Sequence, residues 1–66
     1  MNTFLKLNYY HDPEILETRP VLVRAADIDL VEEIEPGAMV EVQLNNSKTL
    51  TVSDPINEIL QKLNQQ

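Results

Sequence analysis

The acidic segment DIDLVEEIE, residues 27–35, places five carboxylates within nine positions. Carboxylates are the ligands that Mg²⁺ and Ca²⁺ prefer, so a metal site is one interpretation. A calcium loop also needs a glycine at its sharp turn and a closing glutamate at a fixed distance, and the segment has neither. Apolar residues between the acids indicate a folded element with one solvated face. We therefore expect no metal or other cofactor, and we interpret Glu32 and Glu33 as solvated or as presented to a basic partner.

Nucleophilic catalysis has few possible participants. The chain has one histidine, His11, and no cysteine. A base at His11 would have to activate a serine or threonine, and none stands in a recognisable catalytic setting. Paired carboxylates of the glycosidase type need a pocket, for which a chain of 66 residues has little room. We predict that the protein is not an enzyme, and we assign no catalytic residue.

The tyrosines that follow the first apolar stretch are the best candidates for recognition. Tyr9 is expected to pack inward, which leaves Tyr10 and His11 available to a partner. Tyrosine buries a large area at low entropic cost and keeps a hydrogen-bonding hydroxyl, so it is enriched in interfaces. The alternative is that Tyr10 only covers the edge of the core.

Two arginines border the same region. The guanidinium groups of Arg19 and Arg24 could take a carboxylate or a phosphate, or could pair with the chain's own acids. We therefore predict six partner-binding residues: Tyr10, His11, Arg19, Arg24, Glu32 and Glu33.

Length and composition predict a single small domain, residues 1–66. Hydrophobic residues make up 42% of the chain, which suits a globular fold. So short a chain buries a small core, and without cysteine it has neither disulfides nor cysteine zinc sites to reinforce it. We therefore expect a homo-oligomer, a dimer or larger.

Charge and hydropathy narrow the possible partners to other proteins. The net charge is −6 and the five basic residues are scattered, whereas nucleic-acid binders carry a basic stripe, so we expect no nucleic-acid partner. No apolar run is longer than that at Val21–Val23, which is far too short to span a bilayer. No charged leader with an apolar stretch opens the chain, so we expect a cytoplasmic protein.

Period-two alternation predicts the first strands of a sheet. Residues 3–9 alternate, and residues 21–24 resume as a hairpin partner of that strand. Between them, Asp-Pro and Arg-Pro steps favour a loop over residues 9–20. Residues 27–30 are expected to form one helical turn that leads into a third strand.

Turn chemistry predicts the second half of the sheet. Pro36 and Gly37 suit the central positions of a type II turn. A hairpin should follow, with Leu44 across from Leu50, Val42 across from Val52 and an odd loop centred on Ser47. In such a loop we expect Asn46 to take the left-handed conformation.

A helix should end the chain, with Asp54 as its N-cap and Pro55 at its first position. Glu58 and Lys62 have the spacing of an i,i+4 ion pair. The predicted fold is α+β: a small antiparallel sheet of four or five strands with one C-terminal amphipathic helix packed on one face. The predicted core residues are Leu5, Leu7, Val23, Val31, Ile34, Val40, Val42, Leu44, Leu50, Val52, Ile56, Ile59, Leu60 and Leu63.

This order of features resembles the FlbD-type small flagellar and swarming-motility proteins. The matching pieces are FLKLN (4–8), DLVEEIE (29–35), VEVQLNNSKTLTV (40–52) and SDPINEILQKL (53–63). The family's hairpin glycine is replaced by Ser47, and the stretch from residue 9 to residue 20 is longer than the family's tight turn. The resemblance implies a non-enzymatic adaptor that acts on other proteins, with no catalytic residues to transfer.

Three functional hypotheses remain open. The first is the motility-related adaptor that the resemblance implies. The second is a phage-type inhibitor that blocks a host or defence enzyme as an acidic mimic of nucleic acid. The third is a small-ligand sponge, an oligomer that holds nucleotides between subunits with Arg19 or Arg24 on phosphate.

Overall fold

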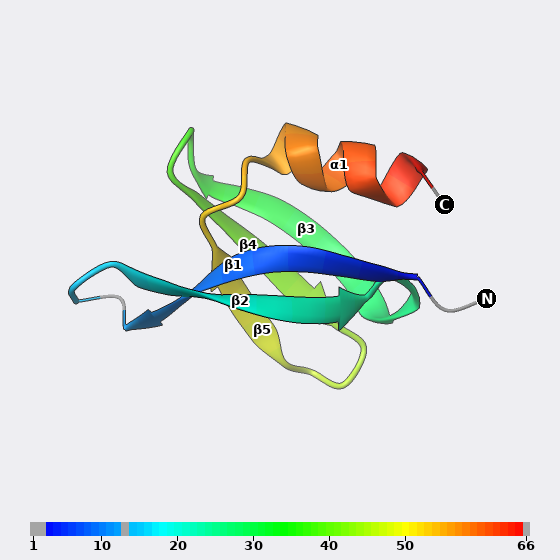
Figure 1. Cartoon of the computed structure of the whole chain (residues 1–66), viewed down its shortest axis with the longest axis horizontal. Coiled ribbons are helices and arrows are strands. Elements are labelled where there is room, and N and C mark those ends of the chain that lie inside the picture. The colour runs from blue at the N-terminus through cyan, green and yellow to red at the C-terminus, as the bar shows by residue number, and fades with distance from the viewer. Residues whose placement is uncertain (1–2, 13, 66) are drawn as a thin grey trace.

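A computed structural model describes residues 3–12 and 14–65 and has a small α+β fold (Figure 1). The sheet has five antiparallel strands in the order β2-β1-β5-β4-β3. Its elements are β1 (Phe4–Asp12), β2 (Glu17–Arg24), a 3-10 turn η1 (Ala25–Asp27), β3 (Ile28–Glu35), β4 (Met39–Leu44), β5 (Thr49–Val52) and α1 (Ile56–Asn64). The predicted fold class is therefore confirmed.

The sheet consists of two parts joined at one place. The β1–β2 hairpin crosses in front of the β3–β4–β5 meander in Figure 1, and Tyr9 pairs with Val52 at the crossing. The apolar faces of the two parts meet there, and α1 lies against β1 and β3. The buried core residues are Leu5, Leu7, Val23, Val40, Val42, Val52 and Ile59.

Two predicted core residues are wrong. Ile34 is 50% exposed because it lies where the β3–β4 register shifts, between Glu33 and Glu35. Leu60 is 55% exposed, although its neighbour Ile59 is fully buried. Successive helical residues are rotated by about 100° (3.6 residues per turn), so a narrow contact between α1 and the sheet buries only one of them.

The loop expected over residues 9–20 is also wrong, because β1 continues to Asp12 and β2 already begins at Glu17. Pro13, in the Asp-Pro step, lies outside the described residues. Pro20 is compatible with β2 because its nitrogen does not face β1. The N–H of Ala25 donates to the carbonyl of Thr3 at 2.8 Å, and hydrogen-bonded pairs alternate along an antiparallel ladder. The nitrogen of Pro20 therefore faces the open edge of the sheet, where a proline is tolerated.

The turns before and after β3 form as predicted, except that the first begins two residues earlier. The helical turn expected at residues 27–30 lies earlier, at Ala25–Asp27, so that Ile28 already begins β3. After β3, the N–H of Ala38 donates to the carbonyl of Glu35 at 2.9 Å, and Gly37 has φ +74°. This positive φ at the second central position agrees with the type II turn predicted from Pro36 and Gly37.

The register predicted for the β4–β5 hairpin is wrong by two residues. Val40 pairs with Val52 and Val42 pairs with Leu50, so the apolar residues keep their face while the centre of the loop moves from Ser47 to Asn46. Ser47, and not Asn46, has the positive φ of 70°. The side chain of Asn46 accepts the N–H of Lys48 at 3.0 Å, which satisfies the backbone of the tight loop.

Replacing Ser47 by glycine should stabilise the hairpin. The left-handed conformation strains a residue that has a Cβ, and glycine adopts it freely. We expect Ser47→Gly to raise the free energy of unfolding by about 0.5–1 kcal/mol in urea titrations. Asn46→Gly is the matched control. It should lower the free energy of unfolding, because Asn46 has no positive φ whose strain a glycine would remove. Equal effects of both substitutions would contradict the assignment of strain to Ser47.

The start of α1 differs from the prediction as well. The helix begins at Ile56 with Pro55 as its N-cap, and Asp54 makes no capping hydrogen bond. The buried carboxylate of Asp54 instead accepts the backbone N–H of Asn8 at 2.6 Å. Lys62 lies 3.9 Å from Asp54 and donates to the carbonyl of Lys6 at 2.8 Å, so its partner is not the expected Glu58.

Candidate protein-binding surfaces

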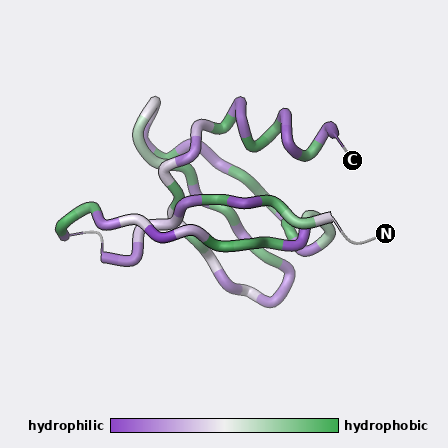
Figure 2. Tube along the Cα trace, in the orientation of Figure 1, coloured by the Kyte–Doolittle hydropathy of each residue, from purple (hydrophilic) through white to green (hydrophobic). Residues whose placement is uncertain are grey.

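The first candidate surface is an arm, residues 10–12 and 14–19, formed by the part of the β1–β2 hairpin beyond the crossing with β5. The arm extends past the rest of the molecule along its longest axis (Figure 1), and that axis measures 37 Å against 22 and 18 Å for the others. Figure 2 shows a short hydrophobic stretch near its tip, next to hydrophilic ones. There Ile15 is 66% exposed and Leu16 is 59% exposed.

The tip of the arm is built by local hydrogen bonding and by strain. The carboxylate of Asp12 accepts the N–H of Glu14 at 3.1 Å, an interaction typical of aspartate in turns. Leu16 then adopts φ 54°, in the left-handed region that a bulky side chain avoids. The turn thus holds two large aliphatic side chains in solvent, one of them in a costly conformation.

Three of the predicted partner-binding residues lie along this arm. Tyr10 is half-buried, and its hydroxyl donates to the carbonyl of Ala38 at 3.3 Å, which connects the base of the arm to the β3–β4 turn. His11 is exposed, and its ring meets the ring of Tyr9 edge-on at 6.4 Å between centroids. Arg19 lies 3.6 Å from Glu17, and both side chains are about half exposed.

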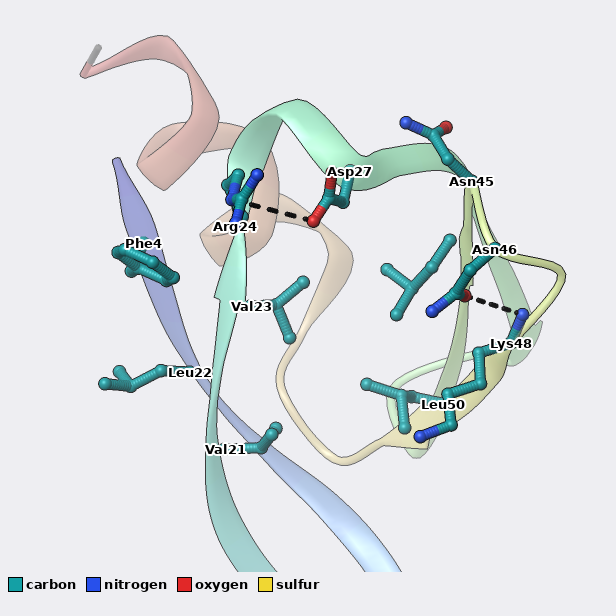
Figure 3. Close-up of a pocket in the computed structure, with 11 residues that line it drawn as sticks. Phe4, Val21, Leu22, Val23, Arg24, Asp27, Asn45, Asn46, Lys48 and Leu50 are labelled. Atoms are coloured by element: carbon teal, nitrogen blue, oxygen red, sulfur yellow. Dashed lines mark hydrogen bonds and ion pairs between the residues drawn. The ribbon is translucent and has the colours of Figure 1, made fainter. Parts of the chain in front are cut away.

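The second candidate surface is a groove of about 360 Å³ between β2 and the β4–β5 hairpin. In Figure 3, Val21 and Val23 of β2 point toward Leu50, while Phe4 and Leu22 point to the other side of β2. The polar residues around the groove are Arg24, Asp27, Asn45, Asn46 and Lys48. An apolar floor with a polar rim suits an apolar side chain whose neighbours carry charge.

One end of the groove is fixed by η1. Arg24 approaches Asp27 at 3.7 Å across this turn, as the dashed line in Figure 3 shows. The backbone N–H of Asn45 donates to the carbonyl of Asp27 at 2.8 Å, and its side chain donates to the carbonyl of Ala26 at 3.1 Å. The hairpin loop and the β2–β3 connection are therefore held together, so this end of the groove has a defined shape.

The acidic residues of β3 lie apart from both surfaces. Glu32 pairs with Glu41 and Glu33 pairs with Val40, so the two glutamates point to opposite faces of the sheet. The six predicted partner-binding residues therefore occupy three places: the arm, the groove and β3. Ile15 and Leu16 were not among them, although two adjacent aliphatic residues in an otherwise polar stretch were a usable signal.

No described residues suggest a metal site or a membrane span. Within residues 3–12 and 14–65, no three side chains of the metal-binding types come close enough to share an ion. In the same part of the chain, no helix is long and apolar enough to cross a membrane. Comparison with protein-family models, with curated proteins and with solved structures found no match.

Proposed function

We propose that the protein is a non-enzymatic binding module that engages another protein through its arm. The observation that carries this proposal is the pair of exposed aliphatic side chains, Ile15 and Leu16, at the end of a projecting hairpin. Isolated exposed aliphatic residues are common on protein surfaces, but two adjacent ones at a projecting tip are costly to keep in water. Tyr10, His11 and Arg19 would provide polar contacts along the sides of the same arm.

The expected energy suits a specific contact. Burial of a leucine or isoleucine side chain contributes about 1.5–3 kcal/mol, so the two tip residues can anchor an interface of moderate affinity. The positive φ of Leu16 supports this proposal, because backbone strain is retained mainly where it serves a function.

A double substitution at the tip tests the proposal. Ile15→Thr keeps β-branching, and Leu16→Asn suits the left-handed region, so the variant should fold at least as well as the natural chain. The partner is first captured with the intact chain and then purified. We expect its affinity for the double variant to be lower by at least about tenfold in calorimetric titrations, because two anchors are lost. Leu60→Gln, which removes an equally exposed leucine from α1, is the matched control and should bind normally.

Two outcomes would contradict the proposal. One is a partner that binds the double variant as tightly as the natural chain. The other is a purified partner whose binding depends on Leu60 as much as on the tip. Circular dichroism and urea titration of each variant separate loss of binding from loss of folding.

The resemblance to FlbD-type proteins supports a motility-related adaptor, whose partner would be a component of the flagellar or swarming machinery. The absence of cysteine suits a cytoplasmic setting, where thiols stay reduced and disulfides are rare. Identification of the purified partner tests this part of the proposal separately. A partner from a host defence system would instead support the phage-type inhibitor.

The acidic-mimic form of that inhibitor has less support than the arm. Mimicry of nucleic acid requires carboxylates in a continuous stripe, whereas Glu32 and Glu33 point to opposite faces of β3. The ligand-sponge hypothesis would place a phosphate near Arg24, which already has Asp27 at 3.7 Å. For these reasons the arm is the preferred binding surface.

A further inference from the structure

The sheet has two open edges, β2 and β3, because these strands come first and last in the order β2-β1-β5-β4-β3. The N–H of Ala25 donates to the carbonyl of Thr3, and hydrogen-bonded positions alternate along β2. The backbone N–H and C=O groups of Leu22 and Arg24 therefore point away from β1. Asn8, which pairs with Pro20, agrees with this alternation. Its N–H and its carbonyl form hydrogen bonds with Asp54 and Ser53, on the β5 side of β1. From Leu22 to Arg24 the outer edge of β2 thus offers unpaired donors and acceptors, which are a template for another strand, whereas Pro20 offers its carbonyl alone.

The surroundings of β2 hold most of the positive charge of a chain that is acidic overall, together with the acids Glu17 and Asp27. Of the five lysines and arginines, four lie on β1, on β2 or at the groove: Lys6, Arg19, Arg24 and Lys48. Leu22 on this edge is 66% exposed, and the neighbouring Phe4 is 52% exposed. The β2 edge therefore favours a strand that carries both acidic and apolar side chains.

The β3 edge has the complementary character. Its acidic residues are Asp29, Glu32, Glu33 and Glu35. Between them, Leu30 is 46% exposed and Ile34 is 50% exposed. β3 is thus regular only from residue 30 to residue 33, between two register shifts, and it has a free edge, negative charges and unburied aliphatic side chains.

From these two edges we infer that the protein self-associates head to tail, with β3 of one copy pairing along β2 of the next. The incoming strand would place alternate side chains over the groove and over Leu22. The ion pairs Arg19–Glu17 and Arg24–Asp27 are exposed and weak, so both arginines can exchange partners. A second copy is the favoured occupant because the chain itself supplies both complementary edges.

The pairing joins two different surfaces, so it forms a closed ring or an open chain of subunits and not an isolated pair. It uses β2 and β3 and leaves the tip of the arm free. The two interactions share Arg19 and are separable at the tip of the arm, so the arm variant Ile15→Thr with Leu16→Asn should associate like the natural chain.

Charge reversal tests the pairing. We expect a variant with Arg19→Glu and Arg24→Glu, and a second variant with Glu32→Lys and Glu33→Lys, each to weaken self-association by at least about 100-fold in sedimentation velocity. An equimolar mixture of the two should associate again, because each acidic edge then meets a basic one. A chain carrying all four substitutions should likewise recover association.

The results that would overturn the inference are equally definite. They are a natural chain that stays monomeric at high concentration, association unaffected by either reversal, or folded variants whose mixture remains monomeric. Salt gives a test that needs no variant, since exposed charges are screened within a Debye length of about 10 Å at 0.1 M. Association of the natural chain should weaken as salt increases, and unchanged association would count against charge pairing.

Discussion

Replacing Ile59 by alanine should cost the protein most of its stability. Ile59 is fully buried, whereas Ile56 and Leu63 of α1 are only partly buried against the core. Truncation of a buried isoleucine typically costs about 2–5 kcal/mol, because transfer energy is lost and a cavity remains. A small domain has about 5 kcal/mol or little more in total, so we expect a large fraction of unfolded chains at room temperature. Urea titration followed by circular dichroism measures the loss.

The neighbouring leucine is the control. Leu60 is 55% exposed, so Leu60→Ala should change the free energy of unfolding by less than about 0.5 kcal/mol. The two substitutions remove aliphatic side chains from adjacent positions of one helix, where helix propensity changes similarly. Comparable losses for both would mean that α1 lies against the sheet through a wider face than described.

The success of the sequence in predicting the strands has a local cause. Val40, Val42 and Val52 alternate with polar residues, which indicates the buried side of each strand. The Pro36-Gly37 pair favours a turn by its own backbone preferences. Such signals come from a few consecutive residues. The fold class and most of the core could therefore be predicted without the structure.

The errors concern features that depend on contacts between distant parts of the chain. A shift of two residues in the β4–β5 register keeps every side chain on its face, so alternation cannot distinguish the two pairings. Pro20 is compatible with a strand because β2 lies at an edge, and only the complete strand order reveals that position. Burial of Ile59 in preference to Leu60 likewise depends on the angle at which α1 meets the sheet.

The candidate surfaces were harder to predict than the fold. Tyr10, His11 and Arg19 were expected near one another and do share the arm, because they flank a single hairpin. The exposure of Ile15 and Leu16 follows from where that hairpin extends relative to β5, which no local pattern states. The relation between the β2 and β3 edges depends on residues far apart in the sequence, so it appears only in the assembled sheet.

Asp54 is the least predictable residue that holds the fold together. It was expected at the start of the helix, but its carboxylate is only 7% exposed and accepts the N–H of Asn8 at 2.6 Å. The carbonyl of Asn8 accepts the N–H of Ser53 at 2.9 Å. Asp54 thus continues, with a side chain, the short ladder that joins β1 to β5.

Loss of that carboxylate should separate the two parts of the sheet. Asp54→Ala leaves a partly buried N–H on Asn8 without its acceptor and removes the partner of Lys62, so we expect the free energy of unfolding to fall by about 2–3 kcal/mol. Asp54→Asn keeps an oxygen acceptor and should lose about half as much. Lys62→Met removes only the ion pair and its contact with Lys6, and should lose about 1 kcal/mol or less.

Hydrogen exchange locates the effect. In Asp54→Ala, the amide of Ser53, which donates to the carbonyl of Asn8, should exchange much faster than the amides of Val42 and Val40, because the junction opens while the β3–β4–β5 meander remains paired. Uniform loss of protection across both parts would instead mean that the sheet unfolds as one unit. In that case Asp54 would contribute to global stability without joining two separable halves.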